Sequence, residues 1–251
     1  MMVLAGYGFV GKAYGWFFER KFKLKIVDPK YNDNKITSDT TSLICCVPTP
    51  ESPDGSCNME HVFEVVKNTP QTAPIIIKST ISLEGWNALS SEFPEHRICF
   101  SPEFLRADNA MEDIQTMKSI ILSGDSDFWL DKVKSIDPQI TAITLTPEEA
   151  ITVKYFRNSY LATKLSFFNE LFDFCKTINI DFDRVREGIS IDPRIGDSHT
   201  FVSDANRGWA GLCFPKDTKA LLKMAENHNT KLSTLEAAVK SNDKIIKDSS
   251  S

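Results

Sequence analysis

The sequence predicts an α/β protein in which an N-terminal, doubly wound sheet is followed by an all-helical domain with one long helix. Two observations predict this. From residue 1 to about residue 145, short apolar runs alternate with helical segments, which is typical of a largely parallel sheet covered by helices on both faces. From residue 146 onward the pattern is helical, and between Ala150 and Asp192 only Gly188 could interrupt a helix. We therefore expect one domain over 1–145 and a second over 146–251.

The bulk composition excludes several kinds of partner. The 251 residues carry a net charge of −5, which argues against nucleic acid or an anionic membrane as the main partner. No apolar stretch approaches the roughly 20 residues that span a bilayer, and the N-terminus does not resemble a signal peptide. Six cysteines without framework spacing indicate reduced thiols and a cytoplasmic location. Four scattered histidines give no ligand spacing, so no metal site is expected.

A glycine-rich turn stands at the start of the chain. The apolar run Met2–Ala5 stops at the G-x-G-x-x-G of residues 6–11, a helical segment follows over Lys12–Arg20, and the apolar run Leu24–Val27 ends in Asp28. Glycines in such a turn let the backbone approach a pyrophosphate, which rests on the helix N-terminus. The acid that follows accepts hydrogen bonds from a ribose diol. The order of strand, turn, helix, strand and acid predicts a Rossmann-like dinucleotide site.

The acid also bears on the choice of cofactor. Asp28 would repel the 2′-phosphate of NADP, and no arginine follows it closely, so NAD is favoured. The alternative is a glycine-rich turn that binds no ligand.

The following strands are expected to border the same crevice. Leu43–Val47 is a continuous apolar run, as in a parallel strand buried on both faces, and it ends in Pro48-Thr49-Pro50. After a helix over Met59–Lys67, the run Ile75–Lys78 stops at Ser79-Thr80. Ligands of such sheets bind outside the carboxyl ends of the strands. Further strands are expected near 97–100 and 119–122.

The second half begins with a helix-start signal. Thr146-Pro147-Glu148-Glu149 is a capping box with proline at the first helical position. A helix from Pro147 to Ile178 would be about 48 Å long at ~1.5 Å per residue. A helix this long and rich in phenylalanine predicts self-association. Lys154 and Asn158 lie four residues apart, hence on one face, although spacing alone fits a solvated face equally well.

A cysteine marks the most informative stretch of this half, residues 208–221. Cys213 stands two residues before Pro215, which opens an apolar-periodic run and so predicts a helix N-terminus there. Unpaired amides at such a position favour the thiolate, and Asp217 lies on the same turn, which together suggest covalent catalysis. The alternative is a buried cysteine that acts as a small hydrophobe. A last helix is expected over Leu232–Lys247, with the final four residues disordered.

Several motifs in this order resemble the UDP-glucose/GDP-mannose dehydrogenase family. They are G-Y-G-F-V-G at 6–11, V-P-T-P at 47–50 with a following D-G, K-S-T at 78–80, S-P-E-F-L-R at 101–106, K-Y-F-R-N-S-Y-L-A-T-K at 154–164, F-x-N-E at 167–170, D-P-R-I-G at 192–196 and C-F-P-K-D-T-K-A-L at 213–221. The resemblance implies oxidation of a nucleotide sugar, with UDP-glucose preferred, at its C6 alcohol to the carboxylate with two NAD. The resemblance also implies that the cysteine attacks the aldehyde to form a thiohemiacetal, which is then oxidised to a thioester.

The resemblance assigns roles to individual residues. It implies catalysis by Cys213, Lys154, Asn158, Asp217, Glu103 and Thr80. It implies cofactor contacts at Gly6, Gly8, Phe9, Val10, Gly11, Asp28, Val47, Pro48, Thr49 and Thr80, and substrate contacts at Glu103, Phe104, Leu105, Arg106, Lys154, Asn158 and Arg194. Lys154 and Asn158 would stabilise an oxyanion, Asp217 with Thr80 would hold the water, and Glu103 would act as acid or base. Arg194 would reach the substrate of a neighbouring subunit, which calls for a homodimer.

The chain also departs from the family pattern. Ala210-Gly211 replaces a Gly-Gly, the loop from 196 to 213 lacks a Pro-Gly, and Ala107 stands where a glutamate is usual. The chain stops after the central domain. We therefore expect that the nucleotide-binding C-terminal domain of the family is a separate chain, has been lost with a change of substrate, or is absent because this sequence is a fragment.

Two other functions stay open. One is a non-catalytic NAD-binding, dimerising module that partners a full-length enzyme. The other is a two-electron dehydrogenase of the 3-hydroxyacid or phosphogluconate type, which needs no cysteine and would survive Cys213→Ala.

Overall fold

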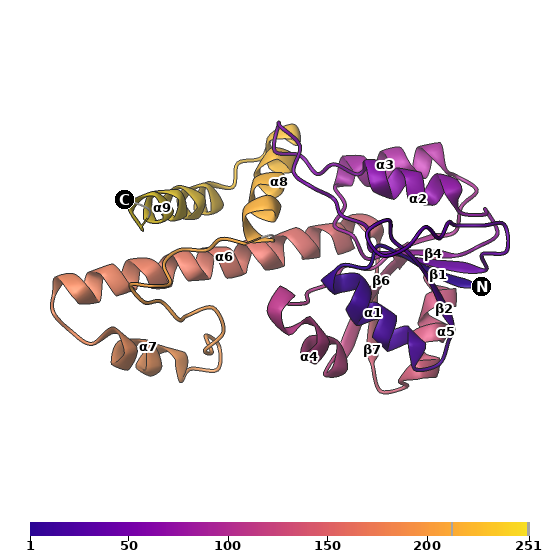
Figure 1. Cartoon of the computed structure of the whole chain (residues 1–251). Coiled ribbons are helices and arrows are strands. Elements are labelled where there is room, and N and C mark those ends of the chain that lie inside the picture. Colours follow the sequence, from indigo (N-terminus) through magenta and orange to yellow (C-terminus); the bar gives the residue numbers. More distant parts are fainter. Residues whose placement is uncertain (212, 250–251) are drawn as a thin grey trace. The chain divides into compact units, whose positions relative to one another are not determined.

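The computed structural model describes residues 1–211 and 213–249 and divides the chain into two compact units (Figure 1). One unit comprises residues 1–52 and 57–154, and the other comprises residues 53–56 and 155–251. The division falls inside the long helix α6 (Pro147–Thr177). None of the helices in the described ranges combines the length and apolar character that a membrane span requires.

A seven-stranded sheet forms the centre of the first unit, in the order β2-β1-β3-β4-β5-β6-β7. Every neighbouring pair is parallel except β5 and β6, which are antiparallel. The strands are β1 (Met2–Ala5), β2 (Leu24–Val27), β3 (Ser42–Cys45), β4 (Ile75–Ile77), β5 (Ile98–Phe100), β6 (Ser119–Gly124) and β7 (Thr141–Leu145). The sequence pattern did not predict β7, because this edge strand is mostly exposed and lacks a continuous apolar run.

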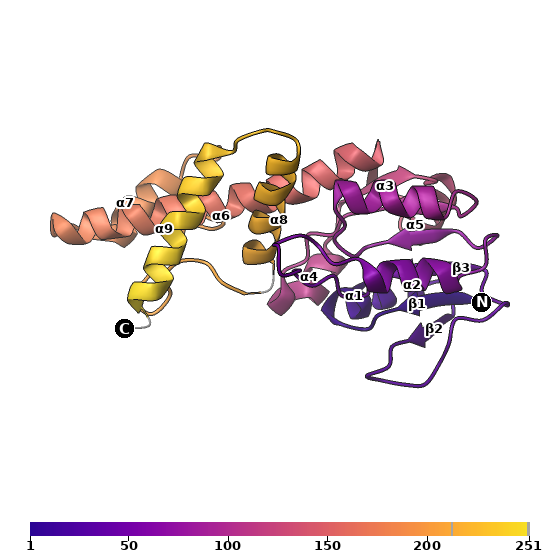
Figure 2. The same cartoon turned by 90° about the horizontal axis from the view of Figure 1, so that it is seen from above.

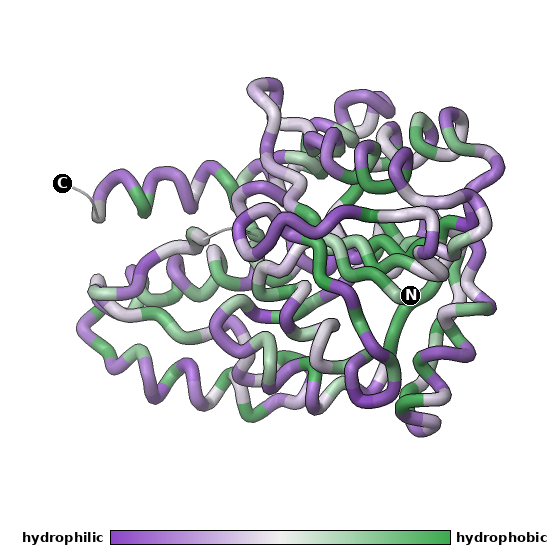
Figure 3. The backbone as a smooth tube through the Cα atoms, turned by 45° about the vertical axis from the view of Figure 1, so that its right-hand side comes forward, coloured by the Kyte–Doolittle hydropathy of each residue, from purple (hydrophilic) through white to green (hydrophobic). Residues whose placement is uncertain are grey.

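Helices cover both faces of this sheet, so the predicted doubly wound α/β class is confirmed. Figure 1 shows α2 and α3 on one face and α1, α4 and α5 on the other. The helices are α1 (Phe9–Glu19), α2 (Glu60–Asn68), α3 (Leu83–Glu92), α4 (Ala110–Gln115) and α5 (Asp127–Ile136), with a 3₁₀ helix over Ala107–Asn109. Strands β1, β3, β4 and β5 are buried along their whole length, and Figure 3 shows hydrophobic (green) segments in the interior of the chain, as expected of strands covered on both faces.

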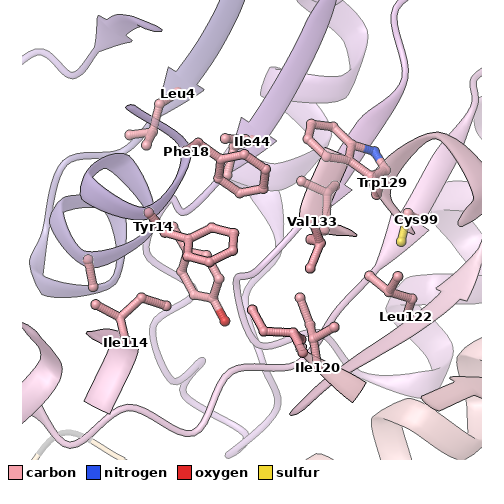
Figure 4. Close-up of a cluster of buried hydrophobic side chains, with 14 of the residues drawn as sticks. Leu4, Tyr14, Phe18, Ile44, Cys99, Ile114, Ile120, Leu122, Trp129 and Val133 are labelled. Atoms are coloured by element: carbon pink, nitrogen blue, oxygen red, sulfur yellow. The ribbon is translucent and has the colours of Figure 1, made fainter. Parts of the chain in front are cut away.

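Aromatic side chains fill the core between the sheet and α1 and α5. Figure 4 shows Phe18 from α1 beside Trp129 and Val133 from α5, with Tyr14 from α1 below Phe18 and Leu4 of β1 at the upper left. The Phe18 and Trp129 rings meet edge to face with their centroids 5.8 Å apart, a preferred aromatic geometry. This packing fixes α1, and with it the glycine turn that precedes α1.

The second unit is helical, as predicted. It contains most of α6, together with α7 (Phe182–Ser190), α8 (Phe214–Asn227) and α9 (Ser233–Ser249), which Figure 2 shows from above. A cluster of Phe168, Cys175, Phe182 and Val202 packs α6 against α7 and the loop after it.

Both ends of the predicted helical region can be compared with the structure. The capping box at the start of α6 is confirmed, because Thr146 N donates to Glu149 Oε2 at 2.8 Å and Glu149 N donates to Thr146 Oγ1 at 3.2 Å.

The disorder expected from residue 248 onward is wrong for residues 248 and 249, which belong to α9. Residues 250–251 lie outside the described part of the chain.

Candidate active site

The glycine turn between β1 and α1 has a backbone that only glycine can adopt. Gly6 has φ of +87°, in the left-handed region that disfavours residues with a Cβ. A Cβ on Gly11 would lie 2.0 Å from the carbonyl oxygen of Gly6, so the helix can approach the turn only without one. These two positions close the turn tightly behind β1.

The mouth of the turn, in contrast, is open. Gly8 is the N-cap of α1, no side chain caps the helix, and a Cβ on Gly8 would meet no atom within 4 Å. Among the described residues, no side chain therefore closes off the N-cap position of α1. A helix N-terminus of this kind binds a phosphate group through its amides and its dipole. The turn fits the pyrophosphate of a dinucleotide.

Asp28 follows β2 and is held by the backbone. Its Oδ2 accepts from the amide of Tyr7 at 2.6 Å and its Oδ1 accepts from the amide of Lys30 at 2.8 Å. Each carboxylate oxygen keeps a second lone pair that can accept from a ribose hydroxyl. The structure thus joins the acid to the glycine turn through Tyr7, as a dinucleotide site requires.

The loops after β3 and β4 are tied together at the carboxyl edge of the sheet. Ser79 Oγ donates to the carbonyl of Val47 at 2.7 Å, and Cys57 Sγ contacts the carbonyl of Thr80 at 3.4 Å. Thr49 is buried as well. The predicted cofactor contacts Val47–Thr49 and Thr80 therefore lie on two adjacent loops.

A buried ion pair forms where the S-P-E-F-L-R segment meets α6. Lys154 Nζ donates to Glu103 Oε1 at 3.0 Å and to the main-chain carbonyl of Glu103 at 2.6 Å. The other carboxylate oxygen of Glu103 accepts from the Leu105 amide at 2.8 Å. Both side chains are less than a tenth exposed, so the pair is shielded from water. Lys154 and Glu103, which are both predicted site residues, are therefore in direct contact.

The residues that follow Glu103 in the S-P-E-F-L-R segment differ in their surroundings. The Phe104 ring lies 5.4 Å from the Lys154 ammonium, and Leu105 packs against the core. Arg106 is exposed and pairs with Asp113 of α4, with Nη2 and Oδ1 2.6 Å apart. Of the predicted substrate contacts in this segment, Arg106 is thus already paired with a side chain of its own unit.

The sequence pattern indicates no role for Lys78 of the K-S-T motif, but the structure buries this side chain. It is 1% exposed, donates to Ser101 Oγ at 2.8 Å and lies 4.1 Å from the centroid of the Tyr14 ring. Burial lowers its pKa to about 7. The same burial raises the pKa of the nearby Cys46 thiol well above its usual value.

The cysteine segment of the second unit starts a helix, as predicted. Cys213 is the half-buried N-cap residue of α8, and Pro215 lies in the first turn. Asp217, in the same turn, is 1% exposed. Its Oδ2 accepts from Asn158 Nδ2 at 2.6 Å and its Oδ1 accepts from Lys216 Nζ at 2.6 Å. The structure brings Asn158 of α6 and Asp217 of α8 together in a buried pair.

Arg194 of the D-P-R-I-G motif lies at the surface of the second unit. Its side chain is 87% exposed and pairs with Asp192, two residues before it. Its Nε and Nη2 both donate to the Asp192 carboxylate.

This architecture is that of a dinucleotide-binding protein with a second, helical unit. Residues 30–139 match the NAD-binding domain of the UDP-glucose/GDP-mannose dehydrogenase family, and residues 148–244 match the central domain of the same family. The chain therefore belongs to the UDP-glucose/GDP-mannose dehydrogenase family, and NAD is confirmed as its predicted cofactor.

Individual relatives agree with this assignment. The chain is 31% identical over 222 residues to a UDP-glucose 6-dehydrogenase of Rickettsia bellii, covering 83% of this chain and 50% of that protein. It is 28% identical to a UDP-glucose 6-dehydrogenase of Campylobacter jejuni, covering 96% of this chain and 72% of that protein. The chain thus spans half the length of the Rickettsia relative.

Solved structures show the same fold. A UDP-glucose dehydrogenase of Pyrobaculum islandicum aligns with a TM-score of 0.83 at 24% identity, over 97% of this chain and 68% of that chain. A GDP-mannose dehydrogenase of Pseudomonas aeruginosa aligns with a TM-score of 0.67 at 19% identity, over 98% of this chain and 69% of that chain.

Proposed function

We propose that this chain carries the cofactor-binding and covalent-catalysis parts of an NAD-dependent nucleotide-sugar dehydrogenase that oxidises the C6 alcohol of UDP-glucose to the uronic acid. The observation that carries the proposal is the start of α8, where Cys213 caps the helix and Asp217, in the same turn, is buried and bonded to Asn158. The relatives named UDP-glucose 6-dehydrogenase support the choice of substrate.

The glycine turn and Asp28 would hold NAD, which supplies the hydride acceptor for both oxidations. The open mouth at Gly8 leaves room for the pyrophosphate, and the two backbone amides on Asp28 keep its carboxylate oriented toward the ribose. Val47–Thr49 and Thr80 would border the same crevice from the neighbouring loops.

Cys213 would provide the covalent step. After the first oxidation, its thiolate adds to the aldehyde carbon and the carbonyl oxygen becomes an oxyanion. Loss of a hydride from this thiohemiacetal gives a thioester, and water then cleaves the C–S bond to release the carboxylate and return the thiolate. A helix N-terminus favours the thiolate form that this addition requires.

The polar groups on α6 would stabilise the charge that develops. Asn158 can donate an amide hydrogen to the oxyanion, and Lys154 can supply a positive charge one turn away. The buried bond from Lys154 Nζ to Glu103 Oε1 places the two side chains in contact, and Glu103 would act as acid or base. Asp217 and Thr80 would hold the hydrolytic water.

We assign dimerisation to the exposed aromatic side chains of α6. Tyr160, Phe167 and Phe174 follow one another at intervals of seven residues and are 63%, 61% and 58% exposed. Large aromatic side chains in a row on one helix face are typical of an interface. Phe167→Ser combined with Phe174→Ser should give a monomer by sedimentation, and an unchanged dimer would refute this assignment.

The alternative is a non-catalytic NAD-binding subunit of a longer enzyme. This chain spans 50% of the length of the Rickettsia relative. Under this alternative the chain binds NAD but produces no NADH from any nucleotide sugar.

The deciding experiment counts the NADH formed for each UDP-glucose consumed by the purified chain. Two NADH per sugar is the expected ratio, and Cys213→Ser should lower turnover on the order of 10³-fold or more, since the nucleophile is lost. Cys175→Ala, at a buried cysteine in the core of the same unit, serves as the control and should keep activity. A ratio near one would indicate simple alcohol oxidation, and no NADH would favour the non-catalytic subunit.

A further inference from the structure

We propose that two buried asparagines, Asn169 of α6 and Asn242 of α9, are positioning residues that hold the segment before Cys213 and thereby set the reactivity of its thiol. We call this pair the amide clamp. The inference rests on the proposed function, because it takes Cys213 as the reactive sulfur.

Asn242 bonds both backbone groups of one residue in the segment. Its Oδ1 accepts from the Trp209 amide at 2.6 Å, and its Nδ2 donates to the Trp209 carbonyl at 3.0 Å. Asn242 is 4% exposed and Trp209 is 5% exposed. Because water cannot replace these bonds, this residue of the loop has one favoured position.

Asn169 holds the two residues that precede Trp209. Its Oδ1 accepts from the Gly208 amide at 2.8 Å and from Arg207 Nε at 3.1 Å, while its Nδ2 donates to the Leu165 carbonyl at 2.9 Å. Asn169 has no exposed surface. Its side-chain oxygen and nitrogen are both bonded, so it forms a complete polar anchor in the core of the unit.

The Trp209 side chain extends this anchor to both helices. Its Nε1 donates to Ser166 Oγ at 2.9 Å, and Ser166 Oγ donates in turn to the Ala238 carbonyl of α9 at 3.1 Å. The Trp209 ring also meets the Phe214 ring edge to face, with centroids 6.5 Å apart. Phe214 is the residue directly after Cys213. Phe214 is also the first residue of α8, so the Trp209 ring contacts the helix that Cys213 starts.

Gly208 makes the close approach of the clamp possible. It has φ of +66°, and a Cβ at this position would lie 2.7 Å from Asn242 Oδ1. A side chain here would therefore push the amide of Asn242 away from Trp209 as well as strain the backbone.

This arrangement does more than join helices. Apolar side chains of similar volume can pack helices as well as buried polar ones do. Here the amide bonds converge instead on the backbone of two consecutive loop residues, four and five positions before the cysteine. Fully bonded buried networks fix one conformation. The consequence is that α9, which bears none of the predicted catalytic residues, determines where the sulfur at the start of α8 can lie.

The test measures alkylation of Cys213 in the full chain by iodoacetamide between pH 6 and pH 9, followed on the Cys213 peptide by mass spectrometry. Asn242→Ala should slow alkylation at pH 7 by about tenfold and move the pH profile upward, because the helix N-terminus no longer acts on a fixed sulfur. Lys244→Ala, at an exposed position of the same helix, should leave rate and profile unchanged.

Two further variants keep the test decisive if Asn242→Ala fails to fold. Gly208→Ala leaves both asparagines intact but displaces the clamp, so it should reproduce the slow alkylation. Asn242→Asp retains an acceptor for the Trp209 amide and loses the donor, so it should give an intermediate rate. NAD affinity, a property of the other unit, should be unchanged in all variants that fold.

A fall in melting temperature with an unchanged alkylation profile in the folded variants would overturn the proposal, since that result is expected of a purely structural contact. Alkylation requires no turnover, so failure of the clamp can be told apart from failure of the proposed function. If Cys213→Ser still formed the acid, the catalytic proposal would fall while the alkylation result stood.

Discussion

Two loops of this protein each precede a helix, and they are built in opposite ways. The glycine turn before α1 is shaped by its own backbone, with Gly6 and Gly11 almost in contact and β1 directly behind. The loop before α8 is held by side chains of α6 and α9, which lie 39 and 33 positions away in the sequence. The glycine turn should therefore lose its conformation when a Cβ is added to one of its glycines. The loop before α8 should lose its conformation when the side-chain amide of Asn169 or Asn242 is removed.

The largest effect in this comparison is expected at the glycine turn. Gly11→Ala places a Cβ 2.0 Å from the Gly6 carbonyl and should both destabilise the first unit and abolish NAD binding. Gly8→Ala meets no atom within 4 Å and should leave folding intact while lowering NAD affinity at least ~100-fold, a loss of about 2.7 kcal/mol, because the Cβ occupies the phosphate space. Calorimetric titration measures the NAD affinity, and thermal unfolding measures the stability of each variant.

The control for these variants is Gly188→Ala. This glycine lies inside α7, and a Cβ there would meet no atom within 4 Å. NAD affinity should be unchanged, and stability should rise by up to about 1 kcal/mol from the better helix propensity of alanine. Equal NAD affinity of Gly8→Ala and the unsubstituted chain would contradict the assignment of the turn.

The next effect concerns the buried ion pair of the first unit. Lys154→Met removes the ammonium that pairs with the buried Glu103 carboxylate and keeps the bond from the Leu105 amide, so it should reduce the free energy of unfolding by about 3 kcal/mol. Urea denaturation measures this loss. Adding Glu103→Leu should restore most of it, because no uncompensated charge then remains. A double variant less stable than Lys154→Met would contradict the view that the uncompensated Glu103 charge causes the loss.

The smallest effect is a pH dependence from Lys78. Its folded pKa of about 7 lies below the ordinary value of 10.5, so between these pH values the unfolded chain binds a proton that the folded chain does not. Stability should therefore increase from pH 7 to pH 8.5, by up to ~2 kcal/mol. Above pH 9 the raised pKa values of Cys45 and Cys99 oppose this gain, because these thiols ionise only on unfolding.

Lys78→Met isolates this contribution. Urea denaturation of the variant at pH 7 and at pH 8.5 should show no increase of stability between them. Lys67→Met, at an exposed position of α2, should keep the increase. An increase of the same size in Lys78→Met would exclude Lys78 as its source.

The two loops also explain what the sequence could predict. The glycine turn, Asp28 and the capping box of α6 are contiguous motifs whose chemistry is local, and the structure has them where they were predicted. Strand β7 escaped prediction because an exposed edge strand needs no apolar run. The fold class followed from alternation alone, because strands buried on both faces must be apolar throughout.

The support of the cysteine segment could not be predicted in the same way. Asn169 and Asn242 bond backbone groups of a distant loop, so their partners carry no side-chain signal in the sequence. Asn169 stood within the F-x-N-E motif without a role, and Asn242 stood in no motif. The available signal was weak: a polar residue that favours non-helical structure, at a core-facing position of a helix. The signal for the burial of Lys78 was weaker still, because that burial depends on Tyr14 and Ser101 from other elements.

The most direct test of the covalent role of Cys213 is to trap the intermediate. Asp217→Asn should slow hydrolysis of the thioester, so that incubation with NAD and UDP-glucose leaves an acyl group on the peptide that contains Cys213, seen by mass spectrometry. The adduct should be absent without NAD, because no aldehyde is then formed. Turnover with no adduct on Cys213, or an acyl group on another cysteine, would contradict the account.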